Sequence, residues 1–63
     1  MQIIHAQAVQ AHLNSVGIGC AIGNTGLDHS VVFGNEIIFD YTEAKSKATL
    51  LVYKIKHEQL TKV

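Results

Sequence analysis

The shortness of the chain is the strongest constraint on its fold. Sixty-three residues form one domain, because a second hydrophobic core does not fit into so little sequence. A chain of this size buries only about 60% of the surface that its unfolded form exposes, so its core is marginal. Small domains usually gain further stability from disulfides, a metal or a partner subunit. We therefore expect a single domain over residues 1–63 that another chain completes.

The cysteine content narrows these options. Cys20 is the only cysteine, which excludes an internal disulfide. Apolar residues make up 48% of the chain and charged residues 16%, a composition too hydrophobic for intrinsic disorder. Self-association, as a homodimer or higher oligomer, or binding to another protein is then the favoured way to complete the fold. The lone cysteine, with no visible signal peptide and no apolar run of about 20 residues, predicts a cytoplasmic protein without a membrane span.

The charges are unevenly distributed along a chain that is neutral overall. Residues 1–40 carry a net charge of −3, residues 41–63 carry +3, and all five lysines lie in the last third. The chain has no arginine, the residue whose planar fork suits bases and phosphates best. This weakens a nucleic-acid interpretation, and the acidic excess of the first part is too small for a DNA mimic.

The first third of the chain predicts a helix followed by a strand. Apolar and histidine side chains share one helical face over residues 3–16, and Gly17 is placed to end that helix in the left-handed conformation. The members of this face are His5, Val9, His12, Leu13 and Val16. Residues 18–23 are small and apolar, which predicts a buried strand. A turn at residues 24–26 and a polar loop at residues 27–30 follow.

Two further strands are predicted at residues 31–33 and 36–39, which are rich in β-branched and aromatic side chains. Gly34 and Asn35 between them favour a two-residue hairpin turn. A bulge within one long strand is the alternative.

The last segment is ambiguous between helix and strand. Residues 49–56 have the composition of a strand, whereas Asp40 and Glu43 form a capping box that favours a helix over residues 41–61. Helical spacing also gathers a core stripe and leaves the lysines outside it. That stripe consists of Tyr41, Ala44, Ala48, Leu51, Val52 and Ile55. The helix interpretation gives an α+β domain of order α-β-β-β-α, with a short antiparallel sheet and two flanking helices; the alternative ends in a strand.

A helix over residues 41–61 carries a second stripe opposite the core stripe. We name it the outer stripe; it consists of Leu50, Tyr53, His57 and Leu60. A small monomer has no second core for such a patch, so the spacing predicts a contact with a subunit or another protein, with Tyr53 as the anchor. Scattered surface residues, or a strand in place of the helix, are the alternatives. The favoured function is a non-catalytic binding or regulatory module.

The alternative function is nucleic-acid binding through the lysine-bearing segment, with Lys45, Lys47, Lys54 and Lys56 as the contact residues. The length and element order also suit a double-stranded RNA-binding module. However, the chain lacks the basic Lys-Lys-x-Ala-Lys helix start and the groove-reaching loop of that class. A solvated helix face is the simpler explanation of the lysines.

The histidines and the cysteine do not form a recognisable site. His5 and His12 are seven residues apart, about 10 Å along a helix, which is too far for one ion. Cys20, His29 and His57 stand singly, whereas structural zinc sites take four ligands, and Cys20 has apolar neighbours that make a thiol inert. The glycines of residues 17–26 follow a helix, unlike those of a dinucleotide loop. We expect no enzyme activity, no cofactor and no metal; a metal site between subunits stays open.

Overall fold

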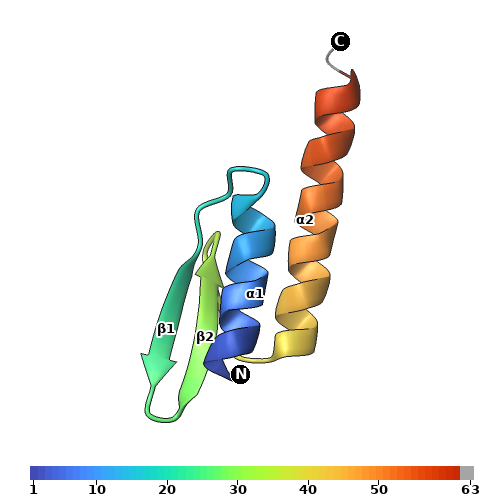
Figure 1. Ribbon diagram of the computed structural model, residues 1–63. Helices are drawn as coiled ribbons and strands as arrows, with labels where there is room; N and C mark the ends of the chain where they lie inside the picture. The colour runs from blue at the N-terminus through green and yellow to red at the C-terminus, as the bar shows by residue number, and fades with distance from the viewer. Residues whose placement is uncertain (62–63) are drawn as a thin grey trace.

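The computed structural model describes residues 1–61 and contains two helices and three strands (Figure 1). In chain order these are α1 (Ile3–Asn14), β1 (Ala21–Thr25), β2 (Asp28–Phe33), β3 (Glu36–Ile38) and α2 (Tyr41–Thr61). The predicted α+β class and the α-β-β-β-α order are confirmed. The last segment is a helix, so the alternative of a C-terminal strand is wrong.

The strands form one antiparallel sheet in the order β1-β2-β3. Helix α1 packs on α2 and on the β1 and β2 strands, while α2 packs mainly on α1 and also touches β3. Figure 1 shows the two helices side by side and running in the same direction. Because α2 continues well past the end of α1, the molecule is elongated, with principal extents of 46, 20 and 18 Å.

The core lies between one face of the sheet and the two helices. Val31 and Ile38 are register partners and therefore share that face, and Phe33 follows on β2. The buried residues of the helices recur at helical spacing, with Ala6, Val9 and Leu13 on α1 and Ala44, Ala48 and Val52 on α2. The predicted core stripe of α2 is confirmed, because its other three members are half-buried.

The predicted core face of α1 is partly wrong. His12 is exposed, His5 is only half-buried, and Ala6 takes a fully buried place that the prediction left out. The reason is that α1 contacts α2 as well as the sheet, which turns its buried face toward Ala6. His5 instead stacks on Tyr41 at the start of α2, with 4.2 Å between ring centroids.

Gly17 ends α1 as predicted. Its φ of +80° is left-handed, its N–H donates to the Asn14 carbonyl at 3.0 Å, and the N–H of Ile18 donates to the Leu13 carbonyl at 3.1 Å. This is the bond pattern of a Schellman motif, which satisfies two carbonyls at the end of a helix.

We expect Gly17→Ala to lower the free energy of unfolding by about 1 kcal/mol. A Cβ at this position would meet no atom within 4 Å, so the loss comes from the positive φ and not from a clash. Gly17→Asn is the matched control and should lose less, because asparagine tolerates this conformation better. Urea unfolding curves measure both variants, and an alanine variant as stable as the original chain would contradict this account.

The first hairpin differs from its prediction. β1 starts at Ala21 rather than at residue 18 and continues through Thr25, while β2 already begins at Asp28. The turn is therefore Gly26 and Leu27, with Gly26 at a φ of +64°. The predicted polar loop over residues 27–30 is wrong, because backbone pairing across a tight turn overrides the polar composition. The second hairpin is confirmed, with Phe33 opposite Glu36 and Gly34 at a φ of +62°.

The α-ammonium group of Met1 joins the start of α1 to the sheet. It donates to Asp28 Oδ1 at 2.6 Å, to the His29 carbonyl at 2.8 Å and to the Phe39 carbonyl at 2.9 Å. The Met1 carbonyl in turn accepts from the His29 N–H at 2.9 Å. The hydrogen bond from the ammonium group is the main reason why the pKa of Asp28 lies below its usual value.

This depressed pKa predicts an acid-sensitive contribution to stability. The ion pair stabilises the folded chain above the pKa of the unfolded chain, and the contribution is lost as pH falls through the lower folded value. We expect the stability difference between the original chain and Asp28→Asn to shrink below about pH 4. Thermal midpoints of both chains across this range measure it. A difference that stays constant down to strongly acidic pH would contradict it.

Candidate interaction surface

The outer stripe is brought together on the side of α2 that faces away from the core. Leu50, Tyr53 and Leu60 are 65%, 68% and 76% exposed, and His57 is exposed as well. The rings of Tyr53 and His57 lie nearly parallel, with their centroids 6.2 Å apart. The buried residues Ala44, Ala48 and Val52 occupy the opposite side of the helix. α2 is therefore apolar on two sides, and the described chain covers only one of them.

The C-terminal part of α2 extends beyond the domain. Val52 is its last buried residue, Ile55 is half-buried, and residues 56–60 are all exposed. Figure 1 shows this part of the helix projecting past the end of α1. Helical segments without tertiary packing are marginal in water, because most helix stability in proteins comes from an apolar face that packs on something. The projecting end is thus the part of the fold that a partner would stabilise most.

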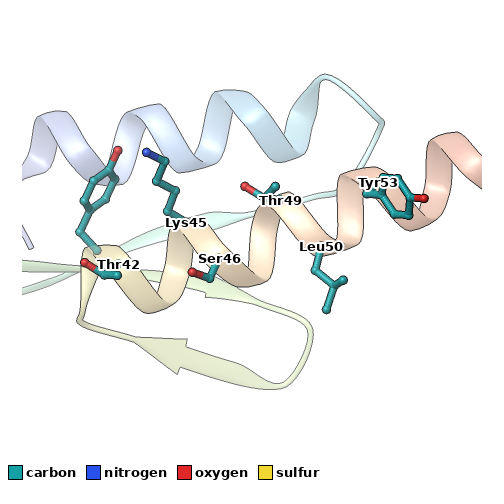
Figure 2. A pocket seen from close by; sticks show the side chains of 7 residues that line it. Thr42, Lys45, Ser46, Thr49, Leu50 and Tyr53 are labelled. Carbon is teal, nitrogen blue, oxygen red and sulfur yellow. The ribbon is translucent and has the colours of Figure 1, made fainter.

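A shallow groove runs along the first half of α2 and meets the outer stripe at Leu50 and Tyr53 (Figure 2). It is lined by Tyr41, Thr42, Lys45, Ser46, Thr49, Leu50 and Tyr53. A smaller groove lies between the helices, where Ala8, Val9 and His12 of α1 face Lys45, Ala48 and Thr49 of α2. In Figure 2, Lys45 and Thr49 lie on the side toward α1, whereas Leu50 points away from it. Most of this lining is uncharged, which suits docking of an apolar surface.

The four candidate lysines do not form one basic face. Helical spacing places Lys45 and Lys56 on one side of the outer stripe, and Lys47 and Lys54 on the other. Lys47 is engaged, because its Nζ lies 2.7 Å from Glu36 Oε2 and 3.5 Å from Glu43 Oε1. The hydrogen bond to Glu36 is the main cause that raises the pKa of Lys47. Lys45 lies over the Tyr41 ring, 5.9 Å from its centroid.

The start of α2 shows the Asp40 half of the predicted capping box, while the Glu43 carboxylate lies against Lys47. Asp40 Oδ2 accepts the N–H of Glu43 at 3.1 Å, which satisfies one of the free donors in the first turn. The ion pair of Lys47 with Glu36 joins the same end of the helix to β3. These contacts hold the N-terminal half of α2 against the domain and set the direction in which its far end projects.

Cys20 is half-buried and forms no disulfide. Burial raises the pKa of the Cys20 thiol above its usual value, which makes the reactive thiolate less available. Within residues 1–61, no three side chains of histidine, cysteine, aspartate or glutamate lie close enough to hold a metal ion.

The sequence did not predict a second apolar surface, which lies on the outer face of the sheet. Register places Ala21, Val32 and Ile37 in one row across the strands, and this row lies opposite the core row of Ile22, Val31 and Ile38. Ile37 is exposed, and Val32 is half-buried. The alternation of apolar residues to both faces is the signal that would have indicated it. This row is shorter than the outer stripe and offers no large aromatic anchor.

No protein-family model, curated protein or solved structure matches this chain. Over residues 1–61, neither helix has the length and apolar character needed to cross a lipid bilayer.

Proposed function

We propose that this chain is a small non-catalytic binding or regulatory module that docks on protein through the outer stripe of α2. The observation that carries the proposal is the exposure of Leu50, Tyr53 and Leu60 in one row on a helix that extends past the rest of the domain. Large aromatic and aliphatic side chains in such a row are the usual anchors of helix-mediated contacts. A cytoplasmic location, expected from the lone cysteine, belongs to the same proposal.

The size of the domain supports this proposal. The core consists of nine buried apolar side chains, three of which are alanines. Such a core contributes little stability beyond what folding costs, so an additional apolar contact has a large relative effect. Burying the outer stripe against another chain would remove three large apolar side chains from water. Each Å² of apolar surface removed in this way stabilises the contact by roughly 25 cal/mol.

Self-association is one form of this contact, and the sequence favours a homodimer or higher oligomer. Light scattering at low micromolar concentration measures the mass of the particle against the 6.9 kDa of one chain. A dimer that dissociates when the outer stripe carries lysines would support the proposal. A monomer would mean that the partner of the outer stripe is a different protein. A dimer that survives those substitutions would place the contact elsewhere and contradict the proposal.

Nucleic-acid binding is the second candidate function. The observation in its favour is that Lys45, Lys54 and Lys56 make no ion pair with an acidic group of residues 1–61. Their division between two sides of α2 and the engagement of Lys47 with Glu36 rank it below protein docking. Mobility-shift assays with duplex RNA and DNA at low salt test it, because phosphate contacts weaken steeply as salt rises. An unshifted duplex at low salt would remove this candidate.

A further inference from the structure

We infer that the occupant of the outer stripe is an amphipathic helix of another protein whose apolar row is bordered by aspartate or glutamate. The inference rests on the proposed function and names the partner's chemistry. Its starting point is spacing: Leu50, Tyr53, His57 and Leu60 follow one another at intervals of three, four and three residues. This is the spacing of the inner positions of a helix-on-helix contact, in which each side chain fits between those of the facing helix.

The side chains that border the outer stripe are basic. Lys54 follows Tyr53 on one border, and Lys56 precedes His57 on the other; these are the flanking positions that select partners in paired helices. Both lysines are exposed, and neither forms an ion pair within the part of the chain that the structure describes. Glu58 is exposed and falls on the helical row of Ala44 and Leu51, so it lies farther around the helix from the outer stripe than Lys54 does. The two charged residues that directly flank the outer stripe between Leu50 and Leu60 are therefore both basic, and the nearest acid on the helix is Glu58, one turn after Lys54.

A second copy of the chain brings no acidic side chain to the lysines on these borders. In an antiparallel pair that sets Leu50 of each helix against Leu60 of the other, each Lys54 lies beside the other Lys54, and each Lys56 beside the other Lys56. Like charges at such positions oppose pairing. In a parallel pair, Lys54 lies beside Thr49, so it again meets no acid. An acidic border on a different helix complements both lysines at once.

The other apolar surfaces lack charged borders that would select a partner. The groove between the helices contains only Lys45 as a charged lining residue, and that lysine already lies over the Tyr41 ring. Among the residues of β1, β2 and β3, Ile37 is the one exposed large apolar side chain, and Phe39, just after β3, is exposed to a lesser degree. Among the apolar surfaces of residues 1–61, the outer stripe combines exposed anchors with a lysine on each border that forms no ion pair there. Charge complementarity of this kind sets specificity and association rate more than total affinity.

Three synthetic helical peptides test the inference with the intact chain. All three carry the same leucine row, and their bordering positions are glutamate, glutamine or lysine. Fluorescence anisotropy of the labelled peptides gives their affinities. We expect the glutamate peptide to bind at least about fivefold more tightly than the glutamine peptide at low salt, with a preference that shrinks as salt rises. The variant Lys54→Glu with Lys56→Glu should reverse the preference toward the lysine peptide.

The outcomes separate this inference from the proposed function. Equal binding of all three peptides that is lost in Leu50→Lys with Tyr53→Lys would overturn the acidic partner while leaving the outer stripe as a docking surface. Self-association through the outer stripe that excludes the peptides would overturn it in favour of a second copy. Absence of binding by any peptide would overturn it as well, and the solution mass of the stripe variant then decides the proposed function independently. Circular dichroism confirms that each variant is folded.

Discussion

Replacing Leu50 and Tyr53 together by lysine is expected to leave the chain folded and to weaken its association with itself or a partner by at least about 100-fold. Both side chains point away from the core, so their loss opens no cavity. The lysines would place two further charges in the middle of an apolar contact, where burial of an unpaired charge is costly. Thermal unfolding reports the fold of the double variant, and sedimentation or anisotropy reports the binding.

Two single substitutions provide matched controls for this experiment. Ile4→Lys and Ile37→Lys change side chains that are 64% and 63% exposed, close to the 65% of Leu50. They lie on α1 and on β3, away from the outer stripe. We expect both to retain full association. Unchanged binding in the double variant, or an equal loss in the controls, would show that the outer stripe is not the specific contact.

Leu13→Ala is expected to produce the largest loss of stability, about 3 kcal/mol or more. Leu13 is fully buried where α1 meets the sheet and α2, and its carbonyl also accepts the Ile18 N–H at the end of the helix. A domain of this length has a total stability of roughly 3–9 kcal/mol. The variant should therefore lose a third or more of its total stability and unfold at a markedly lower temperature, which circular dichroism during heating measures.

Leu13→Met and Leu27→Ala are the controls for this prediction. The methionine variant keeps the volume of the side chain and should lose less than about 1.5 kcal/mol. Leu27 is fully exposed in the first hairpin turn, so its truncation should change stability by less than about 0.5 kcal/mol. A Leu13→Ala chain that unfolds at the same temperature as Leu27→Ala would show that Leu13 is not at the centre of the core.

The helices were the most predictable part of the fold, because their signals are local. Asp40 caps α2 through the N–H of Glu43, and Gly17 ends α1 in the conformation that its position requires. The apolar spacing of α2 correctly separated the side that packs on the core from the side that is exposed. The rotation of α1 was less predictable, since it depends on the contact with α2. His12 therefore appeared to belong to the core face although it is exposed.

The first hairpin shows where local signals fail. Residues 27–30 read as a polar loop, yet Asp28 and His29 pair with Thr25 and Asn24 across a two-residue turn. Their place in the sheet comes from backbone hydrogen bonds, which do not depend on apolar side chains. Hydrogen bonds from Met1 to Asp28 and His29 reinforce it across a long separation in sequence. Such contacts are invisible to an argument from periodicity.

The members of the outer stripe were predictable, but their surroundings were not. Helical spacing alone placed Leu50 and Tyr53 opposite the core. It did not show that α2 extends past the end of α1 or that Lys47 is bound to Glu36. It also did not show that Lys54 and Lys56 form no ion pair with an acid of residues 1–61. These facts depend on where β3 and α1 end relative to α2. Together they define which way the outer stripe faces and which charges border it.

The most direct test of the docking surface is an amide NMR spectrum of the intact chain, recorded while the glutamate-bordered helical peptide is added. We expect the resonances of the outer stripe to shift most, and those of Val32 and Ile37 on the outer face of the sheet to stay in place. Shifts centred on the sheet face, or a spectrum that does not change at all, would contradict it.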